Sequence, residues 1–279
     1  NNTGYYKNSS NWQKGALYIG NYLIEVKNTV SGEFVIKDGT KVIADYAFYF
    51  CAKITSITIP DSVTSIGQGA FLICQLLTSI TIPDGVTSIG KRTFYNCYNL
   101  TSVTIPDSVT SIGDYAFEEC TSLSLIRIGS GITSIGEQAF YNCKSIEQVY
   151  ITDLASWCEI DFTDYISNPL YFGADLYLND VLLTDLVIPE DVKFIDYTFR
   201  GCTSIASITI PEGVTCIGDY AFYGCSSLAT ITIPEGVTGI GRYTFYNCSS
   251  LTSITIPEGV TCIGVYAFYN CSSLTSITI

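Results

Sequence analysis

The sequence predicts a repeat solenoid, in which short units of one kind stack along an axis and share one hydrophobic interior. Three observations predict it. A phenylalanine position recurs every 23 residues, a cysteine follows each of these phenylalanines by three positions, and an I-T-I-P-like motif recurs at the same spacing. Because a unit this short cannot enclose its own apolar face, it buries that face by stacking against its neighbours.

Nine copies of the unit cover about three quarters of the chain. The repeated phenylalanines are Phe48, Phe71, Phe94, Phe117, Phe140, Phe199, Phe222, Phe245 and Phe268. The cysteines that follow them are Cys51, Cys74, Cys97, Cys120, Cys143, Cys202, Cys225, Cys248 and Cys271. The consensus is I-T-I-P-[DE]-x-V-T-x-I-G-x-x-[AT]-F-x-x-C-x-x-L-x-x, so every copy carries the same set of apolar positions.

The first half of each unit reads as two short extended pieces. Residues 77–82 alternate apolar and hydroxylic side chains, which is typical of a half-buried strand. Pro83 has no N–H and ends the ladder pairing, and the acidic residue and glycine after it form a turn. Residues 86–89 are a second extended piece. The glycine after it (Gly67, Gly90 or Gly113) is expected to take a positive φ before the chain folds back.

The second half of each unit is expected to contain one short helical or 3-10 turn. In the third copy this turn spans residues 91–100 and buries Phe94, Cys97 and Leu100. Stacking at the strand spacing then gives a right-handed β/α superhelix, with a parallel sheet on its concave face and these turns on the other.

The repeat pattern divides the chain into four parts. Residues 1–33 form an irregular N-terminal cap segment, 34–148 hold repeats one to five, 149–185 form an irregular island, and 186–279 hold repeats six to nine plus one unfinished strand. The island contains residues 176–183, which read as a β-hairpin with an Asn-Asp turn, and residues 15–23 are its counterpart in the cap. Because the flanking copies stay in phase, we interpret the chain as one continuous solenoid.

The unit resembles the BspA-like class of leucine-rich repeats, which occurs in bacterial and some protozoan surface proteins. The I-x-I-P, V-x-x-I-G, A-F and C-x-x-L elements all recur at the spacing of that class. The resemblance implies a secreted or surface-anchored protein and, as in some members, adhesion to host or microbial proteins. It implies no catalytic residues.

The composition of the chain argues against several classes of binding partner and of catalytic site. The net charge is −13, from 13 basic and 26 acidic residues, which argues against nucleic acid and anionic membranes because both require basic groups. No apolar run is long enough for a membrane span, and residues 1–10 lack the pattern of a signal peptide. Histidine is absent, so the commonest general base and the commonest metal ligand are both missing.

The cysteines and the acidic residues that recur in each copy are interpreted as structural residues. The nine repeat cysteines occupy one core position, so we expect free buried thiols instead of disulfides, and Cys216 and Cys262 lie too far apart to bridge. We predict no metal site and no cofactor: no C-x-x-C pair exists, and the acidic turn residues suit solvent as well as calcium. These turn residues are Asp61, Asp84, Asp107, Glu190, Glu212, Glu235 and Glu258.

The middle of the strand ladder carries the candidate ligand-binding residues. Most outward strand positions hold serine or threonine, as Ser79 and Thr81 do, which suits strand propensity alone. Arg127, Gln148 and Tyr150 depart from this pattern, and Trp157 of the island follows them. Arg, Tyr and Trp dominate binding hot spots, so these four residues are predicted to mark the centre of a ligand face. The alternative is that the aromatic residues of the island only fill the core.

Three functions remain open at this stage. The first is adhesion, or binding of a host or microbial surface or matrix protein or glycan through the sheet face. The second is a spacer or stalk in a larger surface protein. The third, an enzyme such as a glycosidase, would need a carboxylate pair across a cleft, and Glu159, Asp161 and Asp164 are the only acidic cluster outside the repeat turns. Nothing singles them out, so we predict no catalysis.

The last residues predict a second kind of contact. Ile277, Thr278 and Ile279 form the strand of an unfinished repeat. An uncovered strand edge is a template for pairing with another chain. End-to-end self-association through these three residues is therefore a further expectation.

Overall fold

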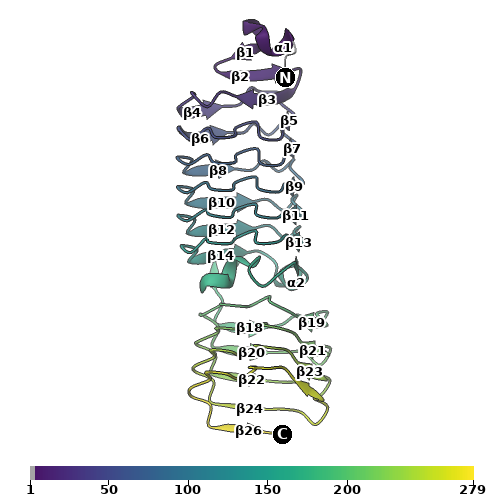
Figure 1. Cartoon of the computed structure of the whole chain (residues 1–279). Helices are drawn as coiled ribbons and strands as arrows, with labels where there is room; N and C mark the ends of the chain where they lie inside the picture. The colour runs from purple at the N-terminus through teal and green to yellow at the C-terminus, as the bar shows by residue number, and fades with distance from the viewer. Residues whose placement is uncertain (1–3) are drawn as a thin grey trace. The chain divides into compact units, whose positions relative to one another are not determined.

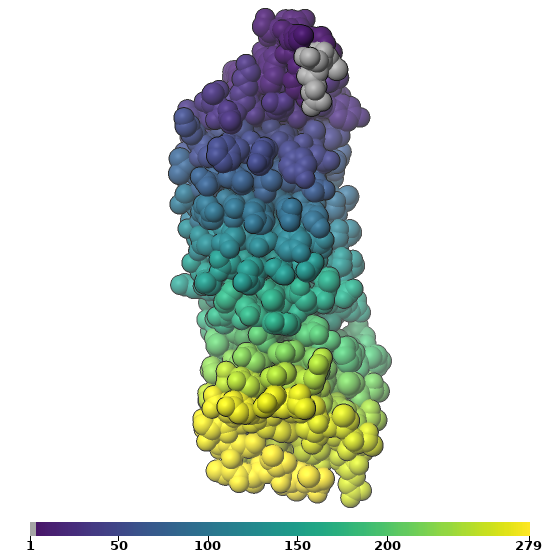
Figure 2. All heavy atoms as spheres, in the orientation of Figure 1, coloured from purple at the N-terminus to yellow at the C-terminus, as the bar shows by residue number. Residues whose placement is uncertain are grey.

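The computed structural model describes residues 4–279. It consists of two compact units, an N-terminal one that ends at Ser145 and a C-terminal one that spans Ile146–Ile279. The predicted divisions after residues 33, 148 and 185 follow the repeat pattern and stay predictions. Within each unit, strands of successive copies lie side by side (Figure 1), and the copies form adjacent bands in the space-filling view (Figure 2).

The N-terminal unit begins with a cap made of a short helix and a hairpin. The cap elements are α1 (Gly4–Lys7), the 3-10 helix η1 (Ser9–Asn11), β1 (Trp12–Gln13), β2 (Ala16–Ile19) and β3 (Tyr22–Val26). Strands β1, β2 and β3 pair antiparallel, and Gly20 at the tip of the β2–β3 hairpin has a φ of 60°. The hairpin predicted for residues 15–23 is therefore confirmed.

Two rows of parallel strands follow the cap in the N-terminal unit. The first row is β4 (Gly32–Val35), β6 (Ile54–Thr58), β8 (Ser79–Thr81), β10 (Ser102–Ile105) and β12 (Leu125–Ile128). The second row is β5 (Val42–Ile43), β7 (Ser65–Ile66), β9 (Ser88–Ile89), β11 (Ser111–Ile112) and β13 (Ser134–Ile135), and β5 also pairs with β3. Both extended pieces predicted in each copy are therefore present.

The C-terminal unit begins with the island and continues with the same two rows. Strand β14 (Gln148–Ile151) leads into the island, which holds α2 (Leu154–Cys158), β15 (Asp161–Phe162), the 3-10 helix η2 (Pro169–Phe172), β16 (Asp175–Leu178) and β17 (Val181–Leu182). The first row is β18 (Asp185–Val187), β20 (Ser207–Thr209), β22 (Thr230–Thr232), β24 (Ser253–Thr255) and β26 (Ser276–Thr278). The second row is β19 (Phe194–Ile195), β21 (Cys216–Ile217), β23 (Gly239–Ile240) and β25 (Cys262–Ile263).

Local sequence explains the island elements. Asp153 begins α2 as its N-cap, and its Oδ1 accepts a hydrogen bond from the Ser156 N–H at 2.6 Å. Strands β16 and β17 pair antiparallel around Asn179 and Asp180, whose φ values are 50° and 64°. Two successive left-handed residues define the tight hairpin turn that an Asn-Asp pair favours, so this predicted hairpin is also confirmed.

The repeated phenylalanines form the core of both units. Eight of the nine are at most 1% exposed, and Phe268 is half-buried. Their rings stack on those of the neighbouring copies, with centroids 5.1–5.2 Å apart from Phe71 to Phe140 and 5.4–5.9 Å apart from Phe199 to Phe268. Each copy therefore buries its core against its neighbours, as the repeat spacing predicts.

The predicted helical turn around each phenylalanine is wrong in its conformation. Residues 91–100 contain turns without a helix, because Arg92 and Asn96 have φ values of 54° and 59°, and a left-handed residue interrupts a right-handed helix. Only alternate N–H groups bond within the turn, and the others bond to the next copy. The N–H groups of Arg92, Phe94 and Asn96 donate to the carbonyls of Asp114, Ala116 and Glu118 at 2.7–2.9 Å.

The prediction of a positive φ at the glycine that follows the second extended piece of each copy is also wrong. Gly67, Gly90 and Gly113 lie outside the left-handed region. The glycine is needed for space: a Cβ on Gly113 would lie 2.7 Å from the Lys91 backbone nitrogen of the preceding copy. Real Cβ atoms do not approach backbone this closely, so the tight stacking of copies requires glycine here.

Candidate functional site

The predicted site residues lie in two different units. Arg127 is an exposed residue of β12 in the N-terminal unit, where it pairs in register with Thr104 of β10. Gln148 and Tyr150 are half-buried on β14 in the C-terminal unit. The Tyr150 ring stacks on that of Tyr177 of β16 at 4.6 Å, and its hydroxyl lies 3.4 Å from the Gln148 Oε1. Gln148, Tyr150 and Tyr177 therefore form one local cluster, while Arg127 is described within its own unit.

Trp157 does not belong to a surface site. Its side chain is 2% exposed, its ring packs edge-on against Phe162, and its Nε1 donates to the Thr198 carbonyl at 3.2 Å. A side chain this deeply buried cannot touch a ligand on the surface. The prediction is wrong for Trp157, which fills the core where the regular unit is lost.

The acidic residues considered for catalysis include one with a structural role. Asp164 accepts hydrogen bonds through Oδ1 from the N–H groups of Ile166 and Ser167, at 2.8 and 2.7 Å. Glu159 and Asp161 line a cavity of about 420 Å³ together with Asp196. Burial, and next the charge of Asp219, raise the pKa of Asp196 to about 7. Within residues 4–279 no group of three or more His, Cys, Asp or Glu side chains could hold a metal ion.

The repeat cysteines are buried free thiols, as predicted. In most copies the thiol donates a weak hydrogen bond to the phenylalanine carbonyl of the preceding copy, as Cys97 Sγ does to Phe71 at 3.2 Å and Cys120 Sγ to Phe94 at 3.1 Å. Burial raises the pKa of Cys97 to about 12. These thiols therefore contribute to packing and are unsuited to nucleophilic chemistry.

The C-terminal unit carries two parallel rows of stacked tyrosines on its surface. We call them the tyrosine strip. The first row lies two positions before the core phenylalanines, and the second lies one position after them. The rows are Tyr197, Tyr220, Tyr243 and Tyr266, and then Tyr223, Tyr246 and Tyr269.

The strip is ordered by ring stacking. Neighbouring centroids are 4.9–6.0 Å apart in the first row and 4.9–5.0 Å apart in the second. Tyr266 and Tyr269 are 56% and 54% exposed. Partial burial, and next the neighbouring hydroxyls, raise the pKa of Tyr220 and Tyr246. Both hydroxyls therefore stay protonated at neutral pH and can donate hydrogen bonds.

Small polar residues flank the second row. Gly201, Gly224, Asn247 and Asn270 follow the core phenylalanines by two positions, and all four have a positive φ. The Asn270 Nδ2 donates to the Asn247 Oδ1 at 2.7 Å, and the Ser249 hydroxyl donates to the Ser226 carbonyl at 3.3 Å. The strip therefore combines Tyr with Gly, Asn and Ser, the residue types that dominate antibody binding loops.

Arg200 takes the place of a tyrosine at the start of the second row. Its guanidinium is enclosed by the rings of Tyr165, Tyr171, Tyr220 and Tyr223, at 4.0–5.1 Å from each centroid. The side chain is 5% exposed, and its Nε and Nη1 have no hydrogen-bond partner. Contact with ring faces compensates the lost hydration of the cation, so Arg200 joins the strip to Tyr165 and Tyr171 of the island.

The repeat pattern matches a known family over most of the chain. Residues 41–163 and 171–279 match the family model described as a BspA type leucine rich repeat region, in six copies. The chain belongs to the BspA-type leucine-rich repeat family. This confirms the resemblance seen in the sequence.

Several solved bacterial structures are similar to this BspA-type protein. A leucine-rich repeat protein from Bacteroides ovatus is 31% identical with a TM-score of 0.66, covering 94% of this chain and 66% of its own. A leucine rich cell surface protein from Faecalibacterium prausnitzii is 30% identical with a TM-score of 0.50, covering 92% and 78%. The pneumococcal vaccine antigen PcpA shares the fold at 20% identity, with a TM-score of 0.53 and coverage of 95% and 80%. No curated protein matches significantly.

These likenesses place the BspA-type protein among bacterial leucine-rich repeat proteins of the surface type. None of the helices within residues 4–279 has both the length and the hydropathy to cross a membrane. The family and its structural relatives are leucine-rich repeat proteins, and solenoids of this kind present extended surfaces along the stack.

Sequence reasoning missed the tyrosine strip. The signal was present, because Y-x-F-Y recurs at Tyr220, Tyr243 and Tyr266, in phase with the core phenylalanines. These tyrosines occupy turn positions, whereas the binding residues were predicted on the strands. The corresponding positions of the N-terminal unit are mixed and include Gly69, Arg92 and Glu118, so a continuous strip forms only in the C-terminal unit.

Proposed function

We propose that this chain is a secreted or cell-surface protein-binding module without catalytic activity, and that the tyrosine strip is its binding surface. The observation that carries the proposal is the double row of stacked, partly exposed tyrosines in the C-terminal unit. Tyrosine provides large contact area and a hydroxyl at low conformational entropy cost. The cell-surface relative from Faecalibacterium supports the proposed location.

Ordering of the rings before binding favours affinity. Each side chain that is immobilised on binding costs about 0.5–1.5 kcal/mol, and the rings of Tyr223, Tyr246 and Tyr269 are already held by mutual stacking. Ring edges and hydroxyls face outward because the faces are stacked. A protein surface with carbonyl and carboxylate acceptors is complementary to such donors.

The test compares a strip variant with a matched control. We expect Tyr246→Ser/Tyr269→Ser to weaken binding to host matrix or microbial surface proteins by about tenfold or more, since truncation of hot-spot tyrosines costs about 2 kcal/mol. The control, Thr232→Ala/Thr255→Ala, changes exposed residues of β22 and β24 on the strand row and should bind normally. Equal binding by both variants would refute the strip as the site, and a chain that binds no such protein would favour the spacer function.

The cluster on β14 and β16 supports a second candidate surface. Gln148 and Tyr150 depart from the serine and threonine pattern, and Tyr150 is ordered by its stack on Tyr177. We keep Gln148 and Tyr150 as a proposed strand-face site for a protein or glycan, and we keep Arg127 as a separate candidate ligand-binding residue of the N-terminal unit. In the same binding assay Tyr150→Ala should reduce affinity if this face is used, while the strip variant should then behave as wild type.

A further inference from the structure

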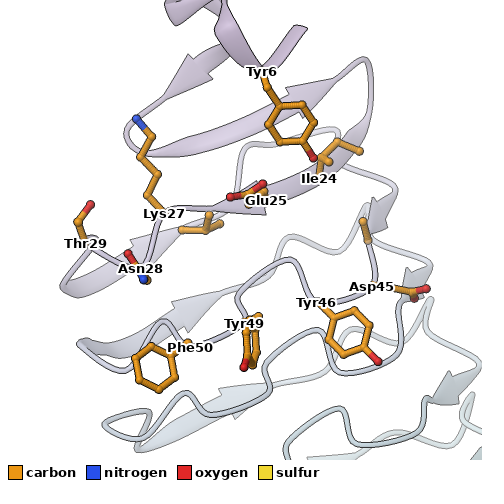
Figure 3. Close-up of a pocket in the computed structure, with 12 residues that line it drawn as sticks. Tyr6, Ile24, Glu25, Lys27, Asn28, Thr29, Asp45, Tyr46, Tyr49 and Phe50 are labelled. Atoms are coloured by element: carbon orange, nitrogen blue, oxygen red, sulfur yellow. The ribbon is translucent and has the colours of Figure 1, made fainter. Parts of the chain in front are cut away.

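A groove lies between the N-terminal cap and the first turn of the repeats. Its volume is about 900 Å³, and the cap lines one side and the first copy the other. Figure 3 shows Tyr6 and Glu25 on the cap side, and Tyr46, Tyr49 and Phe50 on the repeat side. Four aromatic rings and two carboxylates, those of Glu25 and Asp45, therefore line a single concave site.

The backbone on the repeat side of the groove has free acceptors. In a regular pair of copies, three N–H groups of one turn donate to three carbonyls of the next, as Gly69, Phe71 and Ile73 donate to Lys91, Thr93 and Tyr95. The first copy meets strand β3 instead of such a turn. Among residues 4–279 only the Val26 N–H fills this role, donating to the Ala47 carbonyl at 2.7 Å, and no backbone donor pairs with the carbonyls of Asp45 and Tyr49.

The charges in the groove are acidic. Glu25 and Asp45 line it, and Glu25 forms no salt bridge within residues 4–279. One oxygen of Asp45 accepts a hydrogen bond from the Gln68 N–H at 2.8 Å. The single lining cation, Lys27, is held elsewhere: its Nζ lies 4.6 Å from the centroid of the Trp12 ring, and Figure 3 shows the side chain leading away from Glu25.

The backbone conformation and the exposure of Phe50 are both unfavourable for the stability of the fold. It has a φ of 58° and is 49% exposed, whereas four of the later copies place asparagine and two place glycine there. A bulky residue in the left-handed region is strained, and half of its apolar surface gains nothing from burial. Strain that packing does not offset is found at functional sites, and here the strained residue lines the groove.

We propose that this groove binds an arginine- or lysine-bearing segment of a polypeptide partner. The cationic head would lie against Glu25 and between the rings of Tyr6, Tyr46 and Tyr49, where an ion pair and cation–π contacts act together. The N–H groups of the cationic head would donate hydrogen bonds to the free carbonyls of Asp45 and Tyr49. Arginine offers five such donors. Phe50 would cover the aliphatic part of the segment, and the net charge of −13 would attract a basic partner.

The experiment measures binding of a defined peptide by calorimetry at low ionic strength. The probe is a blocked hexapeptide with two arginines separated by a leucine, and the comparison peptide carries citrulline, which is neutral and of the same shape. We expect the arginine peptide to bind and the citrulline peptide to lose at least about tenfold in affinity. Equal binding of both peptides would overturn the proposal, as would no binding of either one.

Variants locate the site. Glu25→Gln and Tyr49→Leu should each weaken the arginine peptide about tenfold. Glu33→Gln removes the same charge from an exposed residue of β4 outside the groove and should leave affinity within about twofold, because water and salt screen an exposed charge that does not contact the peptide. If Glu33→Gln weakens binding as much as Glu25→Gln, the peptide responds to net charge only and the groove assignment fails.

The groove and the tyrosine strip are tested separately. The variant Tyr246→Ser/Tyr269→Ser should bind the arginine peptide like wild type, and Glu25→Gln should leave binding through the strip unchanged. Either proposal can thus fail while the other stands.

Discussion

At the level of single residues, the repeat cysteine couples each copy to the one before it. The Cys97 thiol is fully buried and donates to the Phe71 carbonyl. Burial raises its pKa to about 12, and burial likewise raises the pKa of Cys74 and Cys120. The folded chain therefore keeps protons that an unfolded chain releases near pH 8.5.

This proton difference predicts alkaline destabilisation. The stabilisation that each neutral thiol provides is complete below pH 8.5 and declines as pH rises toward the folded pKa, by about 2 kcal/mol per thiol between pH 8.5 and 10. We expect Cys74→Ala/Cys97→Ala/Cys120→Ala to be less stable at pH 7 but to lose less stability between pH 8 and 10 than wild type, because three of the nine buried repeat thiols are gone. Urea unfolding at both pH values measures the difference. An identical decline in wild type and variant would contradict the prediction.

Ile73 is a second residue with a measurable cost. It has a φ of 62° at the position where six of the other eight copies place asparagine or glycine, and β-branched side chains are the least suited to this region. We expect Ile73→Asn to raise the free energy of unfolding by about 1 kcal/mol, seen as a higher melting temperature. Leu72→Asn, at a similarly half-buried neighbour outside the left-handed region, is the control and should not stabilise.

At the level of elements, the spacing between copies depends on the glycine for which the sequence predicted a positive φ. Gly113 and Gly136 both lie where a Cβ would be 2.6–2.7 Å from a backbone nitrogen of the preceding copy. The second strand row and the turn that follows it therefore stack closely because no side chain intervenes. A methyl group there would push two copies apart and lengthen hydrogen bonds on both sides.

We expect Gly113→Ala to destabilise the protein by about 1–3 kcal/mol, the usual cost of overpacking. Gly239→Ala is the control, because a Cβ there would make only an ordinary contact with Cys216 Sγ at 3.8 Å. That change should be neutral or slightly stabilising. Thermal melts of both variants test the pair, and equal effects would show that loss of chain flexibility, not crowding, controls this position.

The sequence was informative for elements and less so for turns. The repeat strands and the buried Phe94 and Cys97 follow from periodicity, because burial imposes the same residue type on every copy. The hairpin at 176–183 follows from its Asn-Asp turn. The helical turn at 91–100 was wrong because the backbone bonds between copies, and one unit of sequence does not reveal those bonds. Trp157 was misplaced because an aromatic residue in an irregular segment can fill the core or face solvent with the same local sequence. The groove depends on acceptors left unpaired at Asp45 and Tyr49, which no residue type encodes.

At the level of the whole molecule, stability arises between neighbours. Phe117 is fully buried between Phe94 and Phe140, whereas Phe268 has one stacked neighbour and is half-buried. Each unit is therefore a series of similar interfaces whose contributions add along the stack.

We expect Phe117→Ala to cost about 3–5 kcal/mol, as core phenylalanines do, and Phe268→Ala to cost less than half of that. Denaturant unfolding of the two variants gives the comparison. A synthetic peptide of residues 91–113 should be unfolded by circular dichroism, because a single copy lacks both interfaces. A folded peptide, or equal costs for the two substitutions, would contradict a neighbour-stabilised stack.

The regular rows of tyrosine have a consequence for how such a protein can change over generations. Each copy of the pattern Y-x-F-Y contributes one rung to both rows, in fixed register with the last. Duplication or loss of one whole copy would lengthen or shorten the contact area by one rung and leave every interior contact type intact. Reach and avidity could then be adjusted by copy number alone, without redesign of any single interface.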